Sequence, residues 1–176
     1  ERRSEDLFVK IGSDKGEEMT KFINELEDCD SKKLIDELGL EYWTRQMKNK
    51  DSRNRLLRVF LDCGEINKMK YYGRFLANNR DVLNELKDQL VEKLDSSFRF
   101  LIYNGQTSNM EQVGRVNIKK VYFFNELIKF NLVEIHVVFH KLRSMILNLN
   151  SKSSNIDILN IYFDQCGRFL YYVNGK

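Results

Sequence analysis

The chain contains no proline in 176 residues, and its apolar residues recur with a helical period over most of its length. The period is clearest from Lys119 to Val173, where apolar side chains fall at intervals of three and four residues in three successive segments. Such a pattern indicates amphipathic helices that pack through one apolar stripe. Proline breaks helix interiors and is common in β-turns, so its absence also favours helices joined by short polar turns. We therefore predict an all-α fold.

Capping residues and the helical period divide the chain into eight predicted helices. Ser31 is a predicted N-cap, Asp51 or Ser52 should begin the following helix, and Gly64 should end it as a left-handed residue. The predicted helices cover roughly 16–28, 31–47, 51–64, 66–78, 81–101, 117–130, 132–149 and 155–173. Antiparallel pairs with short connections favour a HEAT-like α-solenoid, and a globular bundle is the alternative.

Length and composition fit a single folded domain over residues 1–176, because 42% of the residues are hydrophobic and 31% are charged. Within it we expect an irregular segment at 1–14 and a mobile polar connection at 104–116. The alternative is a helix that restarts inside this connection, because Ser108 and Glu111 have the spacing of a capping box. The chain starts without methionine and stops soon after its last predicted helix, so we interpret it as part of a longer multidomain protein, with C-terminal helices left out. No apolar run approaches the roughly 20 residues of a membrane span.

Cysteine and histidine spacing gives no convincing metal site. Cys29, Cys63 and Cys166 are far apart and form no Cys-x-x-Cys pair, which favours reduced thiols. His136 and His140 have the spacing of two zinc ligands on a helix, but no cysteine or carboxylate nearby in the sequence completes a site. We predict that both histidines lie at the flank or surface of a helix, and that the chain holds no metal.

Motifs for catalysis and cofactors are also missing, since the sequence has no glycine-rich phosphate loop and no Gly-x-Ser-x-Gly. Among the carboxylates, Asp95 and Glu126 have the most apolar sequence neighbours. A hydrogen bond or ion pair between helices explains such groups more simply than catalysis does. We predict no enzyme activity, no cofactor and no small-molecule substrate.

Positive charge is concentrated in the second quarter of the chain. Residues 41–80 carry 10 basic and 4 acidic side chains, whereas residues 1–40 carry 7 basic and 12 acidic ones. The centre of this charge could bind an acidic protein surface or RNA phosphates, and a solvated helix face with local ion pairs is the alternative. Helix geometry prevents all of its arginines from facing one way. The candidate binding residues, which we call the basic belt, are Lys48, Lys50, Arg53, Arg55 and Arg58.

Two sequence words in the second half carry a resemblance to a known family. They are Val-Tyr-Phe-Phe-Asn-Glu-Leu-Ile-Lys-Phe at 121–130 and Cys-Gly-Arg-Phe-Leu at 166–170, with weaker similarity at 72–76 and 48–60. Over about 40–175 the chain resembles the middle-domain family of initiation factor four G (MIF-four-G). Within it, the chain is similar to the second such domain of the Up-frameshift-two adaptors, in their fungal form (Nmd two). Asn125 stands where that family has glycine.

The resemblance implies a stack of HEAT-like helix pairs in a cytoplasmic adaptor of nonsense-mediated mRNA decay. It implies a non-catalytic, monomeric scaffold that contacts other domains of the adaptor and other decay proteins, without a membrane. In that family the site for the third Up-frameshift protein is associated with the last middle domain, so the direct partner of this one stays open. The alternative is a module that binds RNA through the basic belt. We also expect Cys166, Phe169 and Leu170 to share a buried face, with Gly167 allowing a neighbouring helix to approach closely.

Overall fold

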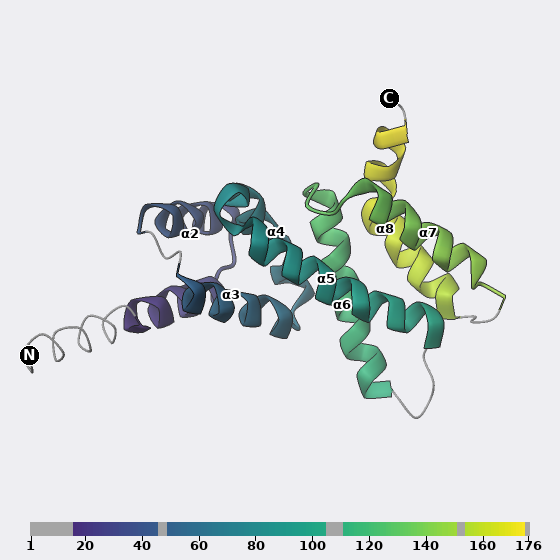
Figure 1. Cartoon of the computed structure of the whole chain (residues 1–176), viewed down its shortest axis with the longest axis horizontal. Helices are drawn as coiled ribbons and strands as arrows, with labels where there is room; N and C mark the ends of the chain where they lie inside the picture. Colours follow the sequence, from purple (N-terminus) through teal and green to yellow (C-terminus); the bar gives the residue numbers. More distant parts are fainter. Residues whose placement is uncertain (1–15, 46–48, 105–110, 151–153, 175–176) are drawn as a thin grey trace, which may run out of the picture.

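The computed structural model describes residues 16–45, 49–104, 111–150 and 154–174, and all regular secondary structure in these ranges is helical (Figure 1). The all-α prediction is therefore confirmed. The predicted irregular segment 1–14 lies outside the described residues. An N-terminal helix covers 16–27, and the helices that follow are α2 (Lys32–Thr44), α3 (Lys50–Asp62), α4 (Ile66–Asn78), α5 (Arg80–Asn104), α6 (Glu111–Lys129), α7 (Ile135–Leu147) and α8 (Ser154–Asn174).

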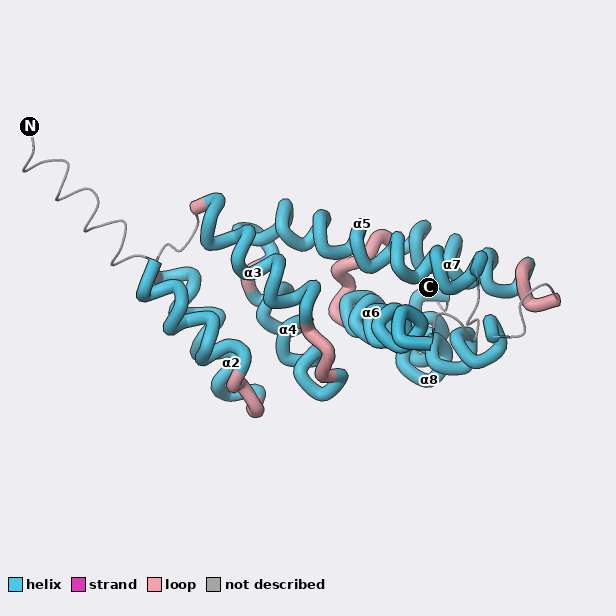
Figure 2. The backbone as a smooth tube through the Cα atoms, turned by 90° about the horizontal axis from the view of Figure 1, so that it is seen from below, coloured by secondary structure: helices cyan, strands magenta, loops and turns pink. Residues whose placement is uncertain are grey.

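The helices form two layers of a solenoid. In one layer α2 packs on α4, α4 on α6 and α6 on α8, and in the other α3 packs on α5 and α5 on α7. Figure 2 shows both layers from below, and α5 with α6 and α7 with α8 form pairs that connect them. This stack of helix pairs confirms the predicted helical-repeat arrangement and excludes the globular bundle. No helix in the described ranges is both long enough and apolar enough to cross a membrane.

Buried aromatic rings form two clusters along the stack. Near the N-terminus, the Phe75 ring lies 5.6 Å from Tyr42, 6.1 Å from Phe22 and 6.2 Å from Phe60, measured between ring centroids. Further along, the Phe98 ring of α5 lies 5.4 Å from Phe124 of α6 and 6.2 Å from Tyr162 of α8. Tilted and edge-on aromatic contacts of this kind stabilise a core beyond the area that they bury.

Helix ends in the first half of the chain agree only partly with the predictions. Ser31 caps α2 as predicted, since its hydroxyl accepts a hydrogen bond from the Leu34 amide at 3.2 Å. Helix α3 begins earlier than predicted, because the Asn49 side chain accepts a bond from the Ser52 amide at 2.7 Å. The prediction for Gly64 was wrong: α3 ends at Asp62, the next residue is extended, and Gly64 does not adopt a positive φ.

Among the described residues, a left-handed helix end lies instead at Asn131, which follows the end of α6 and has a φ of 57°. The Leu132 amide donates to the Leu127 carbonyl and the Asn131 amide donates to the Ile128 carbonyl, both at 2.9 Å. This is the Schellman pattern of hydrogen bonds. It buries Leu132 in the turn and explains why α7 begins at Ile135 rather than at the predicted residue 132.

The predicted loop at 104–116 was too long. Asn104 still belongs to α5, and α6 already begins at Glu111 and continues through Gly114. Glycine lowers helix stability by only about 1 kcal/mol, which the packing of a long helix can offset. The residues between these two helices lie outside the described ranges.

The buried face of α7 differs from the predicted apolar stripe. Val138 and Met145 are buried as expected, but Ile135 and Ile146 are exposed. The helix instead turns Lys141 and Ser144 into the protein. An apolar count cannot reveal this orientation, because the ion pair that holds Lys141 involves a residue 46 positions earlier in the chain.

Candidate functional site

The basic belt lies at the start of α3, and its described side chains point in several directions. Lys48 lies outside the described residues. Lys50 and Arg58 are exposed on α3. The Arg53 guanidinium forms an ion pair with Glu85 of α5, with Nη1 3.1 Å from Oε2. The Arg55 guanidinium turns to the N-terminal helix.

Arg55 contributes to the structure rather than to an open surface. Its Nη1 donates to the Gly16 carbonyl at 3.1 Å, and its Nη2 donates to the Thr20 hydroxyl at 2.7 Å. Because Arg53 and Arg55 bind opposite neighbours of α3, the belt is not one continuous cationic surface. A pocket of about 210 Å³ between α3 and α5 is lined on one side by Lys50 and Arg53 and on the other by Glu85. Lys50 and Arg58 are thus the belt side chains, among those described, that extend into solvent.

The histidines lie where the sequence analysis expected them, because His136 and His140 are both exposed on α7. No group of three or more potential metal ligands occurs in the described part of the chain. Asp95 makes the expected ion pair between helices: its Oδ1 lies 2.6 Å from the Lys141 Nζ of α7. Glu126 pairs within its own helix, with Oε1 2.9 Å from the Lys129 Nζ.

The two sequence words of the resemblance meet in the core between α6 and α8. The Asn125 amide donates to the Gln165 side-chain oxygen at 2.7 Å, and the Cys166 thiol donates to the Asn125 carbonyl at 3.5 Å. Cys166 and Leu170 are buried, but Phe169 is only partly so. The side chain at 125, where the resembling family has glycine, thus forms a hydrogen bond between the two helices.

The close approach of helices occurs at Gly73 rather than at Gly167. A Cβ atom at Gly167 would have no described atom within 4 Å, so the predicted contact there was wrong. A Cβ atom at Gly73 of α4 would lie 2.7 Å from the Phe130 ring, the last residue of the first word. Glycine at position 73 therefore allows α6 to pack tightly against α4.

All three cysteines are free thiols, and burial raises the pKa of each. Desolvation is the largest cause at Cys166, where it raises the thiol pKa to about 12. A thiol with a raised pKa is a poor nucleophile, because the thiolate is the reactive form. At Cys29 and Cys166 burial also blocks access to the sulfur, whereas Cys63 is partly exposed.

We expect partly exposed Cys63 to be alkylated by iodoacetamide at about pH 8 well before buried Cys29 and Cys166. Mass spectrometry of peptides after a short exposure measures the order. The same treatment in concentrated urea is the control, and there all three should react. Labelling of Cys166 as fast as Cys63 without urea would contradict its burial between α6 and α8.

Comparisons with known proteins agree with this architecture. No protein-family model matches the chain. It is 32% identical over 149 residues to nonsense-mediated mRNA decay protein 2 of Saccharomyces cerevisiae, covering 85% of the chain and 13% of that protein. Regulator of nonsense transcripts UPF2 of Arabidopsis thaliana is 28% identical over 153 residues, covering 86% of the chain and 12% of that protein. Regulator of nonsense transcripts 2 of Homo sapiens is 24% identical over 173 residues, covering 97% of the chain and 13% of that protein.

The fold therefore defines the chain as a helical-repeat α-solenoid. The chain belongs to the family formed by these nonsense-decay proteins, as the counterpart of one segment of each, and it spans 12–13% of their length. The resemblance to Up-frameshift two, Nmd two in fungi, is thereby confirmed.

Proposed function

We propose that this chain is a non-catalytic scaffold segment in nonsense-mediated mRNA decay. It is equivalent to the second middle domain of the Up-frameshift-two adaptors and acts in the cytoplasm as a monomer. The observation that supports this most is the 32% identity over 85% of the chain to a fungal protein named for that process. Two-layer helical repeats also suit the role, because they present extended surfaces on which protein partners can bind.

The basic belt is the proposed contact surface for an acidic decay protein. Lys50 and Arg58 supply its exposed charge, whereas Arg53 and Arg55 keep α3 in place against α5 and the N-terminal helix. Binding of RNA through the same surface is the alternative. The geometry favours it less, because proteins that bind single strands usually present a row of cations, and here Arg53 and Arg55 are engaged by Glu85 and by the N-terminal helix.

A charge reversal confined to the exposed residues tests the scaffold role. The variant Lys50→Glu with Arg58→Glu should keep the melting temperature, because neither side chain is buried. We expect the unaltered chain to capture at least one purified decay protein in a pull-down, and the variant to bind it at least about tenfold more weakly, a loss of about 1.4 kcal/mol. Exposed Lys93 and Arg168, changed to Glu together, are the matched control and should bind normally.

Filter binding of RNA at several salt concentrations separates the alternative. Binding to a single strand through phosphates should weaken with a slope of about −0.7 per contact in a plot of log affinity against log salt. A steep slope that disappears in the Lys50 and Arg58 variant would favour the RNA module over the scaffold. Capture of no decay protein by the unaltered chain would overturn the scaffold proposal.

A further inference from the structure

A second pocket lies between α5 and α7, away from the basic belt. It has a volume of about 500 Å³. Five of the side chains that line it are basic or can become so, and one is acidic. They are Arg99, His136, His140, Lys141 and Arg143, with Asp95 as the carboxylate.

The floor of this pocket is a fixed ion-pair group. Asp95 Oδ1 lies 2.6 Å from the Lys141 Nζ, and Oδ2 lies 3.2 Å from the Arg99 Nε. The Lys141 side chain is only 2% exposed, whereas the Arg99 side chain is 52% exposed. Each oxygen of the Asp95 carboxylate therefore pairs with one of the two cations. Because one carboxylate balances only one of them, these three side chains together carry a net positive charge.

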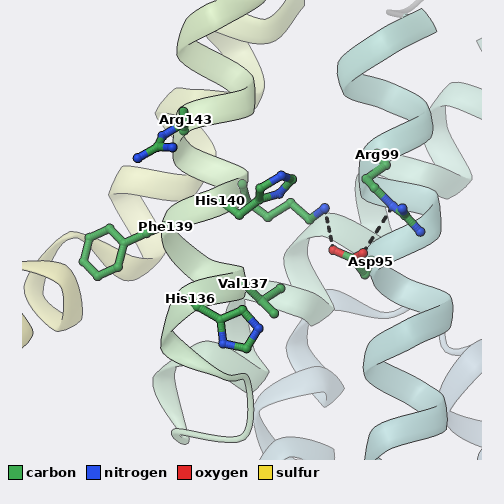
Figure 3. A pocket seen from close by; sticks show the side chains of 8 residues that line it. Asp95, Arg99, His136, Val137, Phe139, His140 and Arg143 are labelled. Carbon is green, nitrogen blue, oxygen red and sulfur yellow. Dashed lines mark ion pairs between the residues drawn. The ribbon is translucent and has the colours of Figure 1, made fainter.

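The mouth of the pocket adds groups that can bind an anion. Figure 3 shows Val137 and His140 on the side of α7 nearer to α5, whereas Phe139 and Arg143 point away from the Asp95 carboxylate. Arg99 stands opposite, on α5, with a half-exposed side chain whose Nη2 also donates to the Ser96 hydroxyl at 3.5 Å. An anionic group at the mouth can therefore be bound by Arg99 from one helix and by His140 from the other, with Val137 as an apolar wall.

Both helices continue past the pocket with exposed apolar side chains. Figure 3 shows that α5 and α7 run in the same direction past the pocket. Arg99 follows Asp95 on α5 in the direction in which His140 and Arg143 follow His136 on α7. One turn after Arg99 is Tyr103, which is 53% exposed, and one turn after Arg143 is Leu147, which is 75% exposed. Apolar surface therefore lies beyond the same end of the cationic pocket.

We propose that this pocket binds an acidic side chain, aspartate or glutamate, in a linear segment of a protein partner. A neighbouring apolar residue of that segment packs against Tyr103 and Leu147. The occupant is a peptide rather than RNA because the pocket offers a single local cluster of cations, which already contains a carboxylate. A nucleic-acid strand would need cations that follow several phosphates. The inference rests on the scaffold function proposed above and names a chemistry for one of its partners.

Selection from a displayed library of short random peptides tests the pocket directly. We expect the recovered peptides to carry aspartate or glutamate close to an apolar residue. The best peptide, labelled with a fluorophore, should bind the variant Arg99→Gln with His140→Gln at least about tenfold more weakly, by fluorescence anisotropy. The matched control is Lys93→Gln, an exposed cation of α5 outside the pocket, and it should change the affinity less than about twofold.

A second measurement does not depend on any variant. On addition of the peptide to the unaltered chain, the NMR signals of the His140 ring should shift, and a peptide with glutamine or asparagine in place of the acidic residue should leave them unchanged. Selection of peptides without acidic residues, equal binding to the variant, or displacement of the peptide by RNA with the same dependence on Arg99 would each overturn the inference.

These experiments distinguish failure of the pocket inference from failure of the scaffold proposal. If the chain captures a decay protein and the Arg99 and His140 variant captures it and the peptide equally well, the pocket inference fails and the scaffold function stands. If the chain captures no decay protein but binds acidic peptides through Arg99, the scaffold proposal fails and the pocket is still a peptide site.

Discussion

Replacement of Phe98 by alanine is expected to lower the free energy of unfolding by about 3–5 kcal/mol, the usual cost of removing a buried phenylalanine ring. The ring is fully buried and touches Phe124 and Tyr162, so the cavity opens where α5, α6 and α8 meet. Urea unfolding followed by circular dichroism measures the loss. Phe163→Ala on α8 is the control, and it should cost less than about 1 kcal/mol because that side chain is 44% exposed.

A loss below about 1 kcal/mol for Phe98→Ala would mean that these three helices do not share a packed core. Phe169 would be a poor choice for the same test. The sequence places it on the apolar face of its helix, but the structure leaves it partly exposed, so its removal should cost less than that of Phe98.

The variant Asp95→Ala should be destabilised by about 3–5 kcal/mol at neutral pH, because it leaves the buried Lys141 ammonium without its partner. Burial already lowers the Lys141 pKa, and removal of the carboxylate should lower it further. The folded state then binds the proton less tightly than the unfolded state. The free energy of unfolding of the variant should therefore rise as the pH approaches the ordinary lysine pKa. Its difference from the unaltered chain should shrink over the same pH range.

The matched variant is Lys141→Met, which removes the charge and keeps the volume. It should cost less than Asp95→Ala, because Asp95 is partly exposed and keeps Arg99 as a partner, whereas Asp95→Ala leaves a buried ammonium with none. Thermal and urea unfolding across a pH series measure both variants. If Lys141→Met costs as much as Asp95→Ala, the ion pair itself stabilises the fold and our explanation is wrong.

Local sequence signals predicted most of the fold. The helical period located all eight helices, and Ser31 marked the start of α2, because both signals depend on residues within one or two turns. Gly64 misled because a glycine after a helix permits a left-handed end without requiring one. The actual left-handed residue, Asn131, depends on the hydrogen bonds of a particular turn.

The candidate sites were less accessible to sequence reasoning, because their contacts join distant segments. Sequence spacing showed that the belt arginines must diverge, but not that Arg55 would reach the Gly16 carbonyl. Similarly, Asp95 was recognised as a partner in some ion pair. Only the packed structure shows that Lys141 is the partner of Asp95 in this ion pair. It also shows that α7 buries Lys141 in place of part of its apolar stripe. In the sequence, Lys141 stands among other polar residues of α7, namely His140, Arg143 and Ser144, so nothing there marked it as the buried one.

The layered stack also affects how this segment would report a bound partner. Most packing contacts among α2 to α8 join helices one or two places apart in chain order, and the contact of Phe98 with Tyr162 reaches three places. In such an arrangement stability is close to a sum over neighbouring repeats, so one end can open while the other stays folded. A partner bound near α3 should slow amide hydrogen exchange there and leave exchange in α8 nearly unchanged. The pattern of exchange along the chain would thus locate the partner without a structure of the complex.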